Sequence, residues 1–338
     1  MTATERMTPQ QRKPPCCFTC FAAVFLAAVI GAVFASCLPE AIAVSGWAGD
    51  RIVTSPLLLP TRENIVFFLT RPWEGFYSPT AMLSLIFDRA CFGTDSFWYH
   101  LHNIAGHVTG AFFLYLALSC LGMRRNAALF LALLWALLPA RAASVASIAG
   151  RRDIACHLFA FISVWAFLRT HRSRQRAAWY GLSALASLIS LGAQVSAWML
   201  MPAVACAAFV QAGGLRKWKT VFTRCCGLWL WQAAAVVFVA LMAAAAGEAG
   251  IAESRCCGLL EAMLLASSGL LFQCRWRSVF AGSRLRRVIY VAAALIIALA
   301  VWQTRRALKS LSAEGADAGY AAASASCTVN RAYRSGWE

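Results

Sequence analysis

The stretch YHLHNIAGH, residues 99–107, opens an apolar segment that covers residues 98–121. Within it, His100, Asn103 and His107 stand at positions i, i+3 and i+7, so an α-helix places all three on one face. Polar side chains are costly in a membrane helix, and they usually face the interior of a bundle or a water-filled cavity. The stretch therefore predicts a membrane helix that packs against its neighbours through a polar face.

Two interpretations of this polar face stay open. Its side chains form hydrogen bonds that hold neighbouring helices together, or they belong to a binding site. A metal site is disfavoured, because no carboxylate shares the face at ligand spacing and the 14 cysteines lie singly or as adjacent pairs in or beside apolar segments. No metal ligands are therefore predicted.

The composition is typical of a polytopic membrane protein. Of the 338 residues, 60% are hydrophobic and 13% are charged, which a water-soluble domain of this length rarely shows. The sequence predicts an all-α bundle of about nine transmembrane helices, several of them shorter than the roughly 20 residues that cross a bilayer. The predicted segments are 17–38, 98–121, 127–139, 154–168, 177–191, 197–210, 227–246, 258–272 and 288–303.

These segments divide the chain into five parts. The longest hydrophilic stretch lies between the first and second segments, and extramembrane chemistry is expected there. The predicted parts are a cytoplasmic N-terminus (1–16), a first transmembrane helix (17–38), a long outer loop with an interfacial helix (39–97), a multi-helix membrane domain (98–303) and a flexible tail (304–338).

Lys and Arg gather in alternate loops, and such an excess marks the cytoplasmic side. Arg6, Arg12 and Lys13 place the N-terminus inside, so the chain is expected to be a multi-pass protein of the inner membrane if the cell is bacterial. Basic residues flank the last segment on both sides, which leaves the side of the C-terminus open. The net charge of +17 is explained by topology and by anionic lipid headgroups, and nucleic-acid binding is not expected.

The first apolar run ends in Phe34-Ala-Ser-Cys37, which loosely matches a lipoprotein cleavage box. The run is long enough to stay in the membrane as an anchor, and we favour that interpretation. Processing at Cys37 stays open as the alternative.

An amphipathic helix is predicted in the long loop, from Ser78 to Phe92. Pro79 suits its first turn, and apolar residues recur after it at helical spacing. We expect this helix to lie along the outer membrane surface, with Asp88 and Arg89 facing headgroups or a substrate cavity. Ordinary interfacial solvation is the favoured role for these two side chains.

Arg151, Arg152 and Asp153 stand at the outer end of the segment 154–168, against the positive-inside trend. An anionic ligand such as a phosphate would explain the cations, because arginine presents a planar fork of donors that suits it. The alternative is local: Asp153 near the start of a helix interacts favourably with the helix dipole and pairs with one arginine.

Six short stretches follow one another along the chain, and their order and spacing are more informative than any one of them alone. They read GWAGDRIV (46–53), YSPTAMLSL (77–85), FG (92–93), YHLHNIAGH (99–107), LPARAASV (138–145) and GRRD (150–153). In this order, residues 46–202 resemble the membrane region of the C-type glycosyltransferase (GT-C) superfold. The branch in question includes tetratricopeptide-linked bacterial membrane proteins and animal O-mannosyltransferases.

The resemblance implies transfer of a sugar from a polyprenyl-phosphate donor to an unidentified acceptor on the outer face of the membrane. It implies that Asp50 is the general base and that Arg151 and Arg152 contact the phosphate. It also implies a supporting shell of Tyr99, His100, Asn103, His107 and Asp153. No cofactor is assigned, and a divalent metal ion stays open because one loop aspartate is too few for a dedicated site.

The chain also departs from the family pattern at several charged positions. The acidic pair is reduced to Gly49-Asp50, Ser78 replaces an arginine, Leu138 replaces a histidine, and the glutamate expected near Ala143 is missing. An inactive GT-C-like scaffold of the envelope, or a lipid-binding membrane protein, is therefore the alternative function. A transporter is disfavoured because no inverted repeat is visible.

Overall fold

The computed structural model describes residues 16–38, 49–73, 77–170, 173–194, 197 and 200–212, short pieces between 219 and 237, and residues 295 and 297–306. The elements in these residues are all helices. They are α1 (Cys16–Phe34), α2 (Gly49–Thr54), α3 (Arg62–Thr70), α4 (Pro79–Phe92), α5 (Ser96–Cys120), α6 (Arg125–Ala136), α7 (Pro139–Ala146), α8 (Arg151–Thr170), α9 (Arg176–Ala193) and α10 (Leu200–Ala212). Three short 3₁₀ turns join them: η2 (Ala35–Cys37), η3 (Pro56–Leu58) and η4 (Ile148–Gly150).

Two helices are long and apolar enough to cross a membrane, namely α5 and the continuous stretch Ile148–Thr170, which joins η4 to α8. The bent pair α6 and α7 makes a third if it counts as one span, and α1 is apolar but shorter. The all-α prediction is thus confirmed, but the described residues supply two or three spans and not nine.

Part of the difference between nine predicted spans and the two or three described arises because some apolar runs form helices too short to cross a bilayer. Helix α10 has 13 residues, so at about 1.5 Å per residue it covers only part of a hydrocarbon core about 30 Å thick. An apolar run therefore need not be a span. The predicted segment 258–272 lies outside the described residues, as do most of 227–246 and part of 288–303.

Pro139 bends the chain at the end of the predicted segment 127–139. Helix α6 stops at Ala136, Leu138 is extended, and α7 begins with Pro139 at an angle of 61° to α6. Proline has no N–H group and fixes its own φ, so it is suited to the first position of a helix and unsuited to the interior. The carbonyl of Leu137 lies at this bend, and the hydroxyl of Thr304 donates to it.

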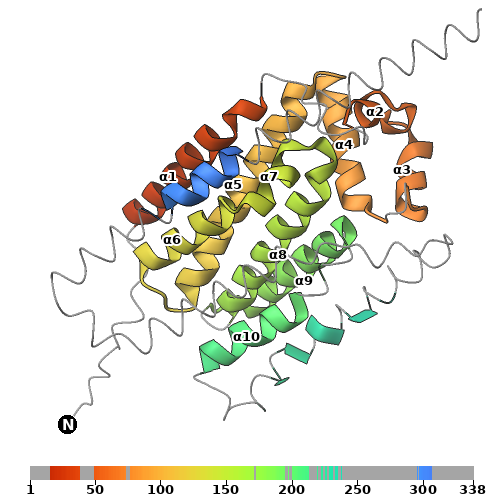
Figure 1. The fold of residues 1–338 in the computed structure, drawn as a ribbon. Coiled ribbons are helices and arrows are strands. Elements are labelled where there is room, and N and C mark those ends of the chain that lie inside the picture. Colours follow the sequence, from red (N-terminus) through yellow and green to blue (C-terminus); the bar gives the residue numbers. More distant parts are fainter. Residues whose placement is uncertain are drawn as a thin grey trace, which may run out of the picture.

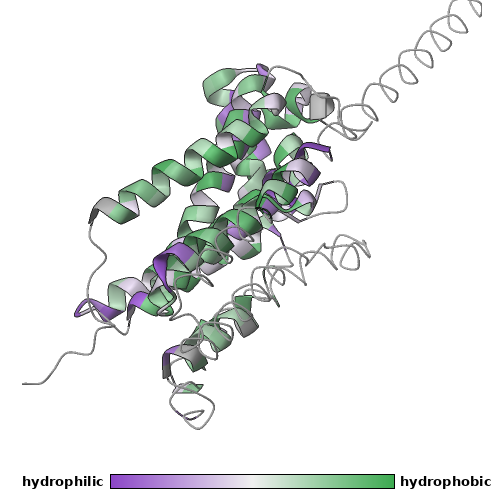
Figure 2. Ribbon diagram, turned by 60° about the vertical axis from the view of Figure 1, so that its left-hand side comes forward, coloured by the Kyte–Doolittle hydropathy of each residue, from purple (hydrophilic) through white to green (hydrophobic). Residues whose placement is uncertain are grey.

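Helices α5 and α8 form the centre of the bundle, with α1 and α6 against α5 and with α9 and α10 against α8 (Figure 1). Figure 2 shows that these helices are hydrophobic along most of their length. Two glycines one turn apart bring α5 close to α8. A Cβ atom on Gly106 would lie 2.9 Å from a methyl of Ile154, and one on Gly110 would lie 3.6 Å from the Leu158 backbone. Small residues at this spacing let membrane helices approach closely.

A Gly106→Leu variant is expected to lose about 1–3 kcal/mol of stability, because the new side chain pushes α5 away from α8. Gly181→Leu is the matched control, since Gly181 also lies inside a helix and a Cβ atom there would meet nothing within 4 Å. Thermal unfolding in detergent micelles measures both. Equal losses in the two variants would show that the α5–α8 contact is not the cause.

Serine hydroxyls join α8 to α9. Ser163 and Ser183 each donate to the carbonyl oxygen of the other at 2.9 Å, and Ser190 donates to the carbonyl oxygen of Cys156 at 2.8 Å. These three serines are buried. Hydrogen bonds of this kind hold helices together where lipid provides no hydrophobic drive.

Residues 49–73 and 77–92 form a small helical unit, which we call the cap. Its buried apolar side chains form a hydrophobic cluster with Tyr99 of α5 and Ile148 of η4. Figure 1 shows α2 and α3 beside α4 at this end of the bundle. The predicted helix 78–92 is confirmed, and α4 has Pro79 at its start. The described part of the predicted outer loop, 49–73 and 77–97, is therefore largely helical and packs on the bundle.

Candidate functional site

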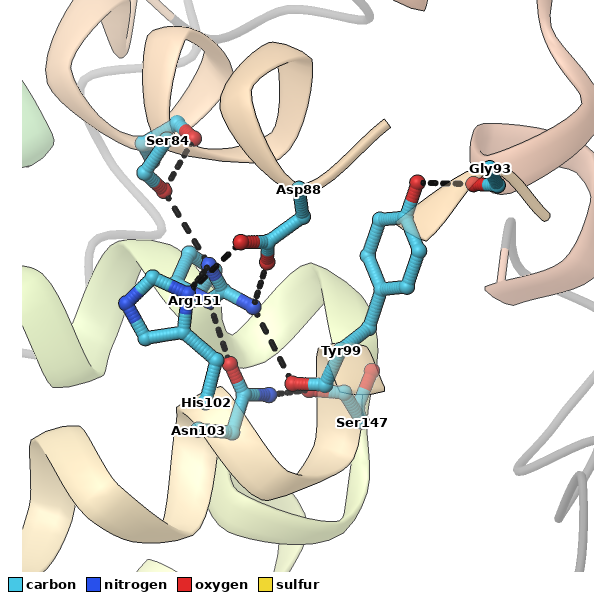
Figure 3. Close-up of polar contacts among 9 residues, drawn as sticks. Ser84, Asp88, Gly93, Tyr99, His102, Asn103, Ser147 and Arg151 are labelled. Atoms are coloured by element: carbon cyan, nitrogen blue, oxygen red, sulfur yellow. Dashed lines mark hydrogen bonds and ion pairs between the residues drawn. The ribbon is translucent and has the colours of Figure 1, made fainter. Parts of the chain in front are cut away.

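Arg151, the first residue of α8, is the centre of a polar cluster where the cap meets the bundle. Its side chain is 3% exposed, and α4, α5 and η4 surround it. Each of its three guanidinium nitrogens has a protein acceptor within reach (Figure 3). The Nε atom donates to Asn103 Oδ1. The Nη1 atom lies 3.3 Å from Ser84 Oγ and 3.1 Å from His102 Nδ1. The Nη2 atom donates to Asp88 Oδ2 at 2.7 Å and to the Tyr99 carbonyl oxygen at 3.0 Å.

Asp88 is fully buried and uses both carboxylate oxygens. Oδ2 accepts from Arg151, and Oδ1 lies 2.7 Å from Nδ1 of His102. The expectation that Asp88 faces headgroups or a substrate cavity, with interfacial solvation as its favoured role, is therefore wrong. Ala81, Leu85 and Asp88 are spaced at i, i+4 and i+7, so the carboxylate lies on the face of α4 that packs on the bundle.

The polar face predicted on α5 is buried at all three positions. His100, Asn103 and His107 are 2%, 0% and 4% exposed. Asn103 Nδ2 donates to the carbonyl of Ser147 at 2.8 Å, and His107 Nε2 lies 2.9 Å from the carbonyl of Ala136 in α6. The contacts of Asn103 and His107 thus support the first interpretation of this polar face, in which its side chains form hydrogen bonds that hold neighbouring helices together.

The turn between α4 and α5 is closed by Tyr99. Its hydroxyl donates to the carbonyl of Gly93 at 2.9 Å, and Gly93 has a φ of +65°, which a residue without Cβ adopts without strain. Earlier in the chain, the hydroxyl of Tyr77 donates to the carbonyl of Leu69 at 2.8 Å. Burial raises the pKa of the Tyr77 phenol, so this hydroxyl acts as a donor.

Arg152 and Asp153 come directly after Arg151 in the first turn of α8, and both are partly exposed. The Asp153 carboxylate accepts a hydrogen bond from Ser144 of α7 at 2.6 Å. An acid in the first turn also interacts favourably with the helix dipole, which supports that part of the local interpretation. A phosphate at Arg151 would have to displace one of the protein acceptors described above.

Asp50 lies in α2, whose neighbouring residues Ile52 and Val53 pack in the same cluster as Ile148 of η4. Helix α2 lies beside η4. Asp50 therefore belongs to the same end of the bundle as Arg151. The side chain of Asp50 lies outside the described part of the structure.

A second buried polar group lies deeper in the bundle, and it was not predicted from the sequence. Arg141 Nη1 is 3.5 Å from His157 Nε2, and the ring of Trp135 packs between those of His107 and His157. A signal for this group exists in the sequence, since His157 is a polar residue inside an apolar segment.

His102, Ser84 and Ser147 were also not predicted as members of the cluster around Arg151. His102 does not lie on the predicted polar face of α5, and its partners come from α4 and α8. In the residues that the structure describes, no group of three or more His, Cys, Asp or Glu side chains is placed to hold a metal ion.

The cap end of the bundle thus combines a buried ion pair, a partly exposed imidazole and the partly exposed pair Arg152 and Asp153. Such a set can bind an anion or move a proton. Comparison with known proteins gave no family model, no curated protein and no solved structure that matches this chain.

Proposed function

We propose that this chain is a multi-pass membrane protein of the GT-C type that transfers a sugar from a polyprenyl-phosphate donor at its cap end. The N-terminus is cytoplasmic, and the cap lies on the outer face. One observation carries the proposal: segments 77–92, 99–107 and 147–153, which hold the stretches that resemble the family, meet around Arg151.

The chemistry of this end suits such a transfer. Developing negative charge on a departing lipid phosphate is stabilised by nearby cations, and Arg152 is partly exposed beside the buried Arg151. The Asp50 carboxylate orients the acceptor hydroxyl as the sugar acquires positive character. Tyr99, His100, Asn103, His107 and Asp153 hold the helices that carry these groups.

A noncatalytic scaffold of the envelope is the second candidate, and a specific observation favours it. Each guanidinium nitrogen of Arg151 is directed at a protein acceptor, so this cation serves to fasten the cap to the bundle. The missing charged residues of the family pattern point the same way.

Transfer of radiolabelled sugar from polyprenyl-phosphate donors in membranes that contain the chain tests the proposal. We expect transfer by the wild type and loss of about 100-fold or more in Asp50→Asn, because a neutral amide holds the acceptor hydroxyl in place less strongly than a carboxylate does. Asp95→Asn is the matched control. Asp95 caps α5 through a bond from the Phe97 amide, and asparagine caps equally well.

The alternative has a clear signature in the same experiment. If the wild type transfers no sugar from any donor while it remains folded, the scaffold is the function. If transfer occurs and Asp50→Asn equals Asp95→Asn, the chain is an enzyme in which the Asp50 carboxylate has no role.

A further inference from the structure

We propose that His102, held by Asp88, accepts the proton of the acceptor hydroxyl, an inference that rests on the proposed sugar transfer. His102 Nδ1 lies 2.7 Å from Asp88 Oδ1. A carboxylate can only accept a hydrogen bond, and this contact is shorter than the 3.1 Å between Nδ1 and Arg151 Nη1, a donor that also has Ser84 Oγ within reach. We therefore assign the ring proton to Nδ1. The lone pair of the neutral ring is then on Nε2.

The side chain of His102 is exposed, which distinguishes it from the buried ion pair beside it. The side chain of His102 is 43% exposed, whereas those of Asp88 and Arg151 are 0% and 3% exposed. Figure 3 shows the second ring nitrogen of His102 pointing away from Asp88 and Arg151. Of the other described histidines, His100, His107 and His157 are buried.

Two opposite charges lie beside the ring. The Asp88 carboxylate of α4 is 2.7 Å from Nδ1, and the Arg151 guanidinium of α8 is 3.1 Å from the same nitrogen. The Ser84 hydroxyl of α4 also lies near the ring, because it accepts a hydrogen bond from the same Arg151 nitrogen. These contacts fix the orientation of the ring, with Nε2 on the side away from the ion pair.

Aromatic residues place this imidazole at the depth of the lipid headgroups. Trp98 stands one helical turn before His102 on α5 and stacks on Phe92 with ring centroids 4.7 Å apart. Phe92, Phe97 and Trp98 are all 37–40% exposed. Exposed aromatic clusters at the end of an apolar helix are typical of the membrane–water interface, where a lipid phosphate and a hydroxyl acceptor meet.

The transfer step conserves atoms and electrons. The acceptor oxygen forms a bond to the anomeric carbon of the sugar, and the bond from that carbon to the phosphate oxygen breaks. The electron pair of that bond leaves with the polyprenyl phosphate, and the hydroxyl proton passes to Nε2 of His102. The imidazolium returns the proton to water. In this scheme His102, and not Asp50, takes the role of the base that the resemblance gives to a carboxylate.

The first test measures sugar transfer by His102→Ala with and without imidazole in the buffer. We expect kcat to fall about 100- to 10,000-fold with KM retained, and added imidazole to restore part of the rate. Asp50→Asn is not restored. Thr109→Ala is the control, since Thr109 is exposed further along α5 and bonds only to the Ala105 carbonyl of its own helix among its described contacts. A His102→Ala variant that transfers at the wild-type rate, or one that imidazole does not restore, overturns the inference.

The second test needs no sugar donor. Diethyl pyrocarbonate modifies neutral, accessible imidazole nitrogens, and the modified peptides are identified by mass. In the full chain with His171→Gln as a common background, we expect one fast-reacting histidine that disappears in His102→Gln. A fast reaction that persists in His102→Gln overturns the inference. If no donor supports transfer, the proposed function fails, and this reaction still decides whether His102 presents a neutral Nε2.

Discussion

Replacement of Asp88 by Ala is expected to destabilise the protein by about 3–5 kcal/mol, because it leaves the buried Arg151 guanidinium without its counter-charge. The carboxylate oxygens lie 2.7 Å from Arg151 Nη2 and 2.7 Å from His102 Nδ1, and the carboxylate is fully buried. Removing it also separates α4 from α8, since the pair links residues 63 positions apart in sequence. Denaturant unfolding in detergent micelles measures the loss.

The double variant Asp88→Leu with Arg151→Met provides the control. When both charges are replaced by apolar groups of similar size, no buried charge is left unpaired, and much of the stability is expected to return. If Asp88→Ala loses less than about 1 kcal/mol, the ion pair is not the connection between cap and bundle. If the double variant is as unstable as Asp88→Ala, the loss comes from packing or from the acceptors of Asn103 and Tyr99 that lose Arg151 as donor, and not from the unpaired charge.

Local signals made the start of α4 and the polar face of α5 predictable. Pro79 sets the first turn of α4, and the spacing of His100, Asn103 and His107 is a helical period. Such features involve residues within a few positions of one another, so they can be read from the sequence without knowledge of tertiary contacts.

The partners of Arg151 could not be predicted in the same way. Asp88 and Ser84 are 63 and 67 positions away from it, and they reach it because the cap folds back on the bundle. The sequence favoured interfacial solvation for Asp88, since an acid in an amphipathic helix usually faces solvent. Its burial depends on the opposite charge of Arg151, which only the tertiary fold brings near.

The number of membrane spans was overestimated for a related reason. Apolar runs were counted without knowing which helices bend or stop early, as α6 does before Pro139. In the described residues, several such runs become short helices that pack around α5 and α8. Hydropathy reports burial in an apolar environment, and the interior of a bundle satisfies it as well as lipid does.

Replacement of Gly150 by Ala is also expected to destabilise the protein strongly, because there is no room for a Cβ atom at this position. A Cβ atom on Gly150 would overlap the carbonyl group of Ser144 in α7, which is backbone and cannot rotate aside. Gly150 ends η4, and Arg151 begins α8 directly after it. A shift of this turn therefore moves the arginine away from Asp88 as well as opening the contact with α7. Gly150→Ala is expected to lose about 3 kcal/mol of stability.

Gly31→Ala is the matched control, with an expected change of opposite sign. Gly31 lies inside α1, and a Cβ atom there would meet nothing within 4 Å. Alanine is favoured over glycine in a helix interior by about 1 kcal/mol, so this variant is expected to unfold at a higher denaturant concentration than the wild type. Gly150→Ala unfolds at a lower one because steric overlap outweighs the gain in helix propensity. A Gly150→Ala protein as stable as wild type would mean that η4 does not fold against α7, and that Arg151 reaches Asp88 without that constraint.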